Sequence, residues 1–305
     1  MRQSKDGRTK EAARGWGGKV ISSLGEDLRR HYAPPDLVRV VFDALAAAGK
    51  DLSHLTLDDL APLDEFHALG RKSTRELAAA AGINGTQRIL DIGAGLGGPA
   101  RYLAETFGCG VTGVDLVEEY CRAASLLAEA TGLARLVEFR QGDALDLPFP
   151  AGSFDLVWTQ HAAMNIPDKA ALYREIHRLL RPGGTLALYD VLAGPGGPAV
   201  FPVPWARQPE SSFLVAPETL GELLGAAGFT VTLWEDRTAA ASEWFERQAG
   251  KARGQGPAPL GLHLLLGSEF ALMLANQQRN FAEGRTLLTL LTAKKGELPQ
   301  GLAMV

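Results

Sequence analysis

A glycine-rich loop between a short apolar run and a helical segment is the feature that most constrains how this chain folds. Residues 88–92 form the apolar run, and Gly93, Gly95 and Gly97 follow it, directly before a predicted helix over 98–106. Glycine adopts positive φ without strain and lets the backbone approach a ligand closely. A strand, such a turn and a helix together indicate a nucleotide-binding βαβ unit, with a tight turn that binds nothing as the weaker alternative.

Strand-like runs alternate with helical periodicity along the rest of the chain. Further strands are predicted at 110–115, 137–141, 154–160, 185–190, 230–234 and 285–293. Helices are predicted between them, at 118–131, 169–180 and 217–227. Strands that alternate with helices in this way favour βαβ units and a parallel sheet. We therefore predict an α/β, Rossmann-like fold with a doubly wound, mostly parallel seven-stranded sheet.

Helical periodicity also continues on both sides of this core. The predicted helices lie at 36–48, 52–60, 73–81, 243–248 and 260–281. Thr56 is a residue type that caps helix starts. The stretch between the last two strands is too long for a simple turn, which suggests an insertion that covers a binding site. We expect an N-terminal helical segment and a helical cap insertion to accompany the sheet.

The domain organisation follows from these patterns. The N-terminal helical segment covers 1–72, the nucleotide-binding core covers 73–193, and 194–305 forms the C-terminal part of the core with substrate-cap insertions. The stretch 2–19 leans basic and is rich in glycine and polar residues, so we expect a mobile terminus there.

Composition limits the partners of the chain. Its 305 residues carry a net charge of −4, which gives no electrostatic footprint for nucleic acid. No apolar run is long enough for a membrane span, and the N-terminus lacks the apolar centre of a signal peptide. Cys109 and Cys121 cannot make a disulfide framework, and no Cys/His cluster has the spacing of a metal site. We expect a cytoplasmic monomer or homodimer that acts on a small molecule without a metal.

Two acids flank the glycine loop. Asp91 precedes it, and Asp115 ends the second predicted strand, where an acid would hold the hydroxyls of a ribose. A dinucleotide site places a pyrophosphate at this helix start, but Asp91 would repel a pyrophosphate and suit a cationic ligand. The third glycine, Gly97, comes one residue earlier than the dinucleotide pattern requires, although Gly98 fills the remaining place of that pattern. After the third strand, Asp143 can accept from an adenine amine and Ala144 can donate its N–H, with an ordinary turn aspartate as the alternative.

Residues 66–190 resemble the class I methyltransferases that depend on S-adenosylmethionine (SAM). The matching motifs are the loop over 91–97, Val114-Asp115, Gly142-Asp143-Ala144, Phe154–Val157 and Leu180–Thr185. Within that superfamily, the segment over 64–70 is similar to sarcosine/dimethylglycine N-methyltransferase-like enzymes, and ubiquinone/menaquinone-type enzymes are the other subgroup that the chain resembles. The resemblance implies transfer of a methyl group from SAM to N, O or C of a small acceptor, leaving S-adenosylhomocysteine (SAH).

The same resemblance implies roles for individual residues. Those implied to hold the methionine end of SAM are Asp91, Gly93, Gly95 and Gly97. Those implied to hold the ribose and the adenine are Asp115, Leu116, Asp143 and Ala144. Those implied to lie beside the cofactor or close over it are Gln160, Phe66, His67 and Gly70.

His161 is the candidate general base. It lies in the loop after the fourth strand, and near pH 7 it could take a proton from an amine, a phenol or a carbon acid. The alternative is a loop histidine that bonds only backbone, because methyl transfer often needs only proximity and alignment. His67 is a weaker candidate for the same role. The sequence does not locate an arginine clamp for an acceptor carboxylate, and the candidates are Arg207, Arg237 and Arg279.

Two other functions stay open at this point. A SAM-binding protein that does not transfer methyl would carry the same glycines and acids. An NAD(P)-dependent oxidoreductase is disfavoured by Asp91 and by the lack of a Tyr-x-x-x-Lys motif after the fourth strand. Aromatic residues after the core could form a cage for the acceptor or simply pack the cap, and they are Phe201, Trp205, Phe213, Trp234 and Trp244.

Overall fold

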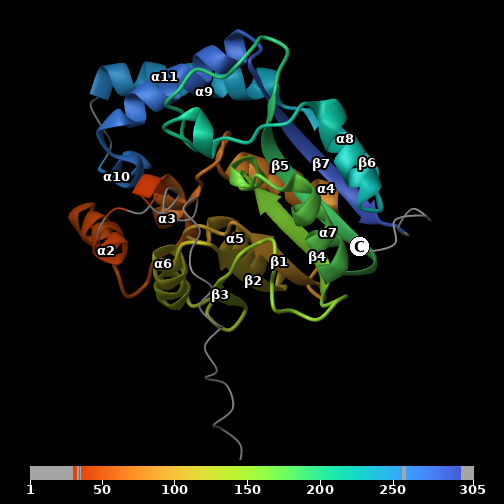
Figure 1. Cartoon of the computed structure of the whole chain (residues 1–305). Coiled ribbons are helices and arrows are strands. Elements are labelled where there is room, and N and C mark those ends of the chain that lie inside the picture. The colour runs from red at the N-terminus through yellow and green to blue at the C-terminus, as the bar shows by residue number, and fades with distance from the viewer. Residues whose placement is uncertain (1–29, 33, 35, 256–258, 297–305) are drawn as a thin grey trace, which may run out of the picture.

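The computed structural model describes residues 30–32, 34, 36–255 and 259–296. A seven-stranded sheet runs through it in the order β3-β2-β1-β4-β5-β7-β6 (Figure 1). The strands are β1 (Arg88–Ile92), β2 (Gly110–Asp115), β3 (Val137–Gln141), β4 (Phe154–Gln160), β5 (Leu180–Ala193), β6 (Phe229–Asp236) and β7 (Thr286–Lys295). Strand β7 runs antiparallel to β5 and to β6, and the other strand pairs are parallel. The predicted α/β, doubly wound, mostly parallel sheet is confirmed. The basic-leaning stretch 2–19 lies outside the described residues.

Helices cover both faces of the sheet. They are α2 (Leu37–Ala47), α3 (Leu57–Asp64), α4 (Arg71–Ala81), α5 (Gly98–Phe107), α6 (Glu118–Ala130), α7 (Lys169–Leu179), α8 (Pro217–Ala226), α9 (Thr238–Gln255), α10 (His263–Leu266) and α11 (Phe270–Ala282). Successive side chains of a strand point to opposite faces. Ile89 accordingly packs in the cluster that contains α4 and α5, while Leu90 packs in the cluster that contains α7 and α8.

Three helix predictions needed correction. The helix predicted at 52–60 begins only at Leu57, because Thr56 forms a capping box in which its hydroxyl accepts from the Asp59 amide and its own amide donates to Asp59. The helix predicted at 260–281 is interrupted at Gly267, whose φ of 77° ends α10 before α11 starts. The short helix predicted at 243–248 is the middle of the longer α9.

Strand β5 is also longer than the predicted 185–190. The extension beyond Asp190 is explained by β7, which pairs with β5 continuously from Thr185 to Ala193, while at the other end Leu180 pairs with Phe154 of β4. The antiparallel neighbour satisfies the backbone groups of residues that a sequence pattern assigns to a loop. This pairing carries the β5 chain to the segment over 194–216, which leads to α8.

Helices α2, α3 and α9 to α11 pack with one another beside the helices that cover the sheet. Helices α9 and α11 pack against each other, and α10 contacts α2 (Figure 1). A separate apolar cluster joins α2 and α3 to α6 and to residues 260 and 265, with Leu45, Leu60 and Leu127 in its centre. In the described part of the chain, no helix combines the length and apolar character that crossing a membrane would require.

Candidate functional site

A cavity of about 870 Å³ opens at the carboxyl ends of β1, β2, β3 and β4. Parallel strands bring their following loops to one edge, and ligands of such sheets bind there. The residues from the sequence prediction that line it are Phe66, His67, Gly93, Gly95, Asp115, Leu116, Asp143, Ala144, Gln160 and His161. Gly70, Asp91 and Gly97 are not among its lining residues. The sequence prediction therefore identified residues from four separate loops that the fold brings together.

The three glycines of the loop after β1 differ in why each position needs a residue without a side chain. A Cβ on Gly93 would lie 2.3 Å from Cβ of Ala162, and one on Gly97 would lie 2.3 Å from the ring of Phe139. Both positions are therefore closed by protein packing. Gly95 has a φ of 53° and no atom within 4 Å of a Cβ placed there. Gly95 is thus the loop glycine whose missing side chain leaves open space beside the cavity.

Asp115 ties the loop to the next strand. Its Oδ2 accepts from the amide of Gly95 at 2.9 Å, and its Oδ1 accepts from the amide of Val117 at 2.9 Å. Burial raises the pKa of this carboxyl, although these amide hydrogen bonds oppose the shift. Each carboxylate oxygen has a further lone pair. The arrangement can therefore receive a pair of hydroxyl groups from a ligand in the cavity.

Asp91 is a buried acid with an unpartnered oxygen. It is 2% exposed, and its Oδ2 accepts no hydrogen bond from the described residues. Burial and the nearby charge of Asp115 raise its pKa to about 7. Asp91 does not line the cavity, so a ligand there could be influenced by its charge but would not contact its side chain. A cationic ligand would relieve the cost of burying this carboxylate.

The loop after β3 forms another wall. Asp143 accepts from the amide of Leu145 at 3.0 Å, and the amide of Gly142 donates to the carbonyl of Asp115 at 2.9 Å. The side-chain amide of Gln141 donates to the carbonyl of Leu116 at 3.0 Å. These bonds fix the residues predicted to read an adenine directly beside the acid predicted to hold a ribose.

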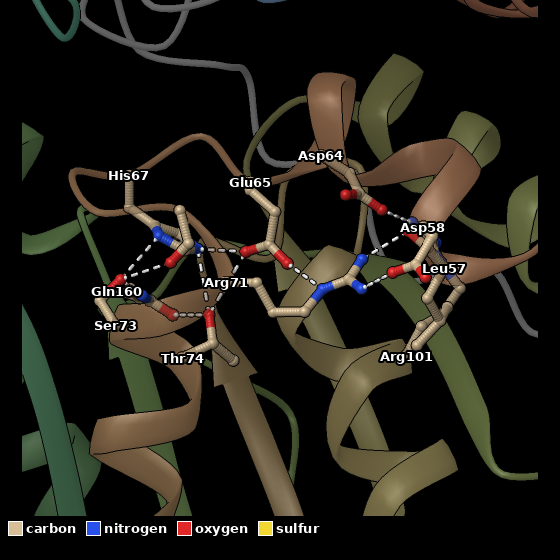
Figure 2. Close-up of polar contacts among 11 residues, drawn as sticks. Leu57, Asp58, Asp64, Glu65, His67, Arg71, Ser73, Thr74, Arg101 and Gln160 are labelled. Atoms are coloured by element: carbon tan, nitrogen blue, oxygen red, sulfur yellow. Dashed lines mark hydrogen bonds and ion pairs between the residues drawn. The ribbon is translucent and has the colours of Figure 1, made fainter. Parts of the chain in front are cut away.

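A buried polar network lies beside the cavity, between the start of α4 and the end of β4 (Figure 2). His67 pairs through Nε2 with Oε2 of Glu65 at 3.0 Å, and its Nδ1 lies 3.1 Å from Oγ of Ser73. Gln160 donates to the same Ser73 hydroxyl at 3.1 Å. Arg71 donates to Glu65 at 3.0 Å. Both ring nitrogens of His67 are therefore engaged by protein groups, which fixes the ring in the cavity wall.

Glu65 is the acid of this network. Burial alone would raise the pKa of Glu65, but the hydrogen bond from His67 and the guanidinium of Arg71 outweigh burial and hold that pKa below its usual value. Glu65 thus stays ionised in a buried position and orients His67 in the way a buried carboxylate orients the histidine of a catalytic triad.

His161 differs from His67 in its backbone conformation and in the partners of its ring. Its backbone is in the left-handed region at φ 53°, and its ring stacks on Tyr189 with 5.5 Å between centroids. Its buried Nε2 has no hydrogen-bond partner among the described residues. Burial, reinforced by His67, holds the pKa of His161 well below its ordinary value. Burial therefore keeps the imidazole in its neutral form, in which one ring nitrogen is free to accept a hydrogen bond.

Several lining residues escaped the sequence prediction, and Tyr32 is the main one. Its hydroxyl donates to Oδ1 of Asn165 at 2.9 Å, and its carbonyl accepts from the hydroxyl of Tyr120 at 2.8 Å. Its ring meets Phe66 edge-on, with 5.7 Å between centroids. Tyr32 therefore closes one end of the cavity from the N-terminal segment. No local pattern around Tyr32 signals this contact, because it depends on elements far along the chain.

Asp64 is a second lining residue, and it received no role of its own from the sequence although it begins the 64–70 segment. It lies at the end of α3 and pairs with Arg101 of α5 at 2.7 Å, with both side chains almost fully buried. The carbonyl of Asp64 also lies only 2.4 Å from where a Cβ of Gly98 would stand. The N-terminal helices are thus joined directly to the helix that follows the glycine loop.

The candidate arginines and aromatic residues lie elsewhere. Arg207 is paired with Glu269, Arg237 with Glu76 at 3.0 Å, and Arg279 with Glu283 at 2.7 Å. None of the three lines the cavity. The same holds for the aromatic residues proposed as a cage, which are Phe201, Trp205, Phe213, Trp234 and Trp244. Trp205 is 2% exposed, as expected of a residue that packs the core.

The sequence around this site is similar to known methyltransferases. Residues 90–188 match the family model described as a methyltransferase domain. The chain is 35% identical over 132 residues to the glycine/sarcosine/dimethylglycine N-methyltransferase of Actinopolyspora halophila, which covers 43% of this chain and 23% of that protein. It is 40% identical over 102 residues to the chloroplastic tocopherol O-methyltransferase of Arabidopsis thaliana, covering 33% of this chain and 29% of that protein.

A solved structure extends the similarity beyond the matched domain. The structure of the cyclase SpnF superposes with a TM-score of 0.63 at 25% identity, covering 85% of this chain and 94% of that chain. The chain spans less than a third of the length of either curated relative described above. The glycine loop, Asp115 and the Gly142–Ala144 segment all fall inside the matched range. Residues 90–188 therefore match a methyltransferase domain, which supports the expected resemblance of this part of the chain to the class I SAM-dependent methyltransferases.

Proposed function

We propose that this protein transfers the methyl group of SAM to N, O or C of a small-molecule acceptor and releases SAH. The observation that carries the proposal is one continuous cavity that joins Gly95 and Asp115 to Gln160 and His161. An in-line displacement needs the sulfonium and the acceptor in one space with the reacting atoms aligned. A cavity that joins the nucleotide-binding loops to the end of β4 supports this arrangement.

The proposed cofactor site follows the loops of the cavity. Asp115 would hold the ribose hydroxyls, with Leu116 against the adenine. Asp143 and Ala144 would read the adenine edge. The methionine end would lie along the Gly93–Gly97 turn, with Phe66 and His67 over it. The buried charge of Asp91 favours the ammonium and sulfonium of SAM over the pyrophosphate of a dinucleotide.

We assign the role of general base to His161 and not to His67. A base must have a ring nitrogen within hydrogen-bond reach of the acceptor. His161 is neutral and has a nitrogen without a protein partner, whereas both nitrogens of His67 are already occupied. His67 and its partner Glu65 then serve as a fixed part of the wall.

The relatives suggest the range of acceptors. The names of the two curated relatives point to glycine derivatives and to tocopherol as the acceptors of those proteins. For this chain we propose a small amine, glycine derivative, quinone-like compound or natural product.

We also propose a cytoplasmic monomer or homodimer that does not act on nucleic acid. The two free, buried cysteines, Cys109 and Cys121, are compatible with a reducing compartment.

A second candidate function is a SAM-binding protein that catalyses another reaction. The specific observation in its favour is the similarity to the cyclase SpnF over 94% of that chain. Release of SAH separates the two candidates, because only methyl transfer consumes SAM. An NAD(P)-dependent oxidoreductase is less favoured, since Asp91 would repel a pyrophosphate at the loop.

Calorimetric titration of the purified protein with SAM, SAH and NADH tests the proposal. We expect SAM and SAH to bind, NADH not to bind, and Asp115→Ala to abolish the binding of both SAM and SAH. The matched control is Asp43→Ala on α2, where the carboxylate is exposed and outside the cavity. Tighter binding of NADH, or SAM affinity that survives D115A, would reject the proposal.

A further inference from the structure

The charges that line the cavity are predominantly negative. The lining residues include four aspartates, which are Asp64, Asp115, Asp143 and Asp146. Asp64 is offset by Arg101 at 2.7 Å. Among the described lining residues, Arg140 is the single lysine or arginine, and its guanidinium is paired with Glu138 at 2.8 Å. The described wall thus offers an anion no cation that is not already paired with a carboxylate.

The end of the cavity after β4 is lined by apolar side chains and by an amide whose groups already make hydrogen bonds. Tyr32, Phe66 and Ile166 line it together with Asn165. The amide of Asn165 is fully used, since its nitrogen donates to the carbonyls of Trp205 and Ser211 and its oxygen accepts from Tyr32. Apart from Gln160 and His161, this end therefore offers an acceptor mainly apolar surface.

A buried cation beside this end of the cavity, Lys169, is used by backbone carbonyls. Lys169 is buried at the start of α7, and its ammonium donates to the carbonyls of Ala163 and Ile166 at 2.7 and 2.5 Å. Lys169 does not line the cavity. It holds the turn that carries Asn165 and Ile166 but provides no contact for an acceptor anion. Arg207, Arg237 and Arg279 are likewise paired outside the cavity.

We infer that the acceptor is an uncharged, largely apolar molecule with a single nucleophilic group and no carboxylate or phosphate in the cavity. This inference rests on the proposed methyl transfer and narrows its substrate class. An anion moved from water into this space would lose its hydration without gaining a cationic partner. It would also face the carboxyl groups of Asp115, Asp143 and Asp146, which offer an anion no favourable charge. A neutral phenol or aryl amine on an apolar body pays neither of these costs.

Binding to the SAH-saturated protein tests the inference without knowledge of the natural acceptor. The probes are matched pairs, in which one member ends in a methyl group and the other in a carboxylate. Butylphenol is compared with hydroxyphenylbutanoate, and butyl-N-methylaniline with (methylamino)phenylbutanoate, because an aryl amine is uncharged near pH 7. We expect the neutral phenol and the amine to bind at least about tenfold more tightly than their carboxylate partners, which corresponds to one unfavourable charge contact.

A variant reverses the expected preference. Ile166→Arg places a cation in the apolar end of the cavity, so the carboxylate members should gain affinity and the neutral members should lose it. Leu126→Arg is the control, since Leu126 is 39% exposed on α6 and does not line the cavity. The SAH affinity and the melting temperature of each variant are measured first. The comparison on the wild-type protein stands by itself if I166R does not fold.

The outcomes are distinct. Equal or tighter binding of the carboxylate members overturns the inference, and so does failure of both neutral probes to bind the SAH complex. Failure of SAH itself to bind rejects the proposed function and not merely the acceptor class. Neutral preference in the wild type, reversed in I166R and kept in L126R, supports the inference.

Discussion

Asp115 accepts a hydrogen bond from the backbone amide of Gly95 at 2.9 Å, so the acid after β2 and the glycine loop after β1 form one unit. The amide that donates is that of the loop glycine with open space beside it. A change at Gly95 therefore acts on the ligand position and on the acid together.

Gly95→Ala should weaken SAM binding by at least about tenfold, since the methyl enters the cavity and disturbs the amide that holds Asp115. Strain at a φ of 53° should also lower the free energy of unfolding by about 1 kcal/mol. Gly49→Ala is the matched control, because Gly49 has a φ of 72° and no neighbour within 4 Å. Calorimetry and urea unfolding separate the effects. Similar losses of SAM affinity in both variants would contradict a local role for Gly95.

The buried acid Asp91 should make the ligand-free protein less stable as the pH rises. Its pKa of about 7 lies above the value of an unfolded aspartate near 4, so the folded state holds a proton that the unfolded state releases. The contribution is present below pH 4 and is lost as the pH rises towards 7, by up to about 4 kcal/mol.

Asp91→Asn should flatten this dependence, measured as the free energy of unfolding between pH 4 and 7. Asp190 has a pKa raised to about 7 as well, so the difference between wild type and D91N isolates Asp91. Asp43→Asn, at an exposed carboxylate, should leave the slope unchanged. An identical slope in D91N would show that Asp91 is not the titrating group. SAM should bind D91N about tenfold more weakly, because the cation loses its counter-charge.

The ion pair between Asp64 and Arg101 should be sensitive to removal of one partner. Arg101→Met leaves a buried carboxylate without its cation, and we expect a loss of about 3–5 kcal/mol in the free energy of unfolding. Adding Asp64→Asn to R101M should recover part of that loss, since the unpaired charge is gone. Arg39→Met, at an arginine that is 73% exposed, should change stability by less than about 0.5 kcal/mol. No recovery in the double variant would mean that packing, not charge, dominates at Arg101.

His161→Asn should lower kcat by about a hundredfold or more with a phenolic acceptor, and leave SAH affinity unchanged. The loss should shrink as the pH approaches the pKa of the phenol, because an ionised acceptor needs no base. His54→Asn is the control, since His54 is exposed and outside the cavity. A loss that stays constant with pH would assign His161 to positioning and not to proton transfer.

The sequence predicted the parts of the fold that depend on local patterns. Apolar runs gave the bounds of β1 to β4, and Thr56 signalled a helix start. The loop glycines and Asp115 were predictable because a ligand-binding turn requires particular residue types in a fixed order. The sequence could not reveal that Gly93 and Gly97 are closed by Ala162 and Phe139, since those contacts exist only in the folded sheet.

The missing site residues share one physical reason. The hydrogen bond from Tyr32 to Asn165 joins positions 133 residues apart, and Asp64 reaches Arg101 from a different helix. A pattern read within a short window carries no information about such pairs. Arg207 and Arg237 stay open as clamp candidates in the sequence for the same reason, because their partners Glu269 and Glu76 lie far from them along the chain.

The contact between Gly98 and the carbonyl of Asp64 has a consequence for engineering this protein. A Cβ at Gly98 would lie 2.4 Å from that carbonyl, so the junction between the N-terminal helices and the sheet domain tolerates no side chain. A chimera that replaces residues 37–64 with the corresponding segment of another protein would have to reproduce both this junction and the buried pair with Arg101. Recombination to change the acceptor should therefore exchange residues 37–107 as one block, which keeps the junction intact.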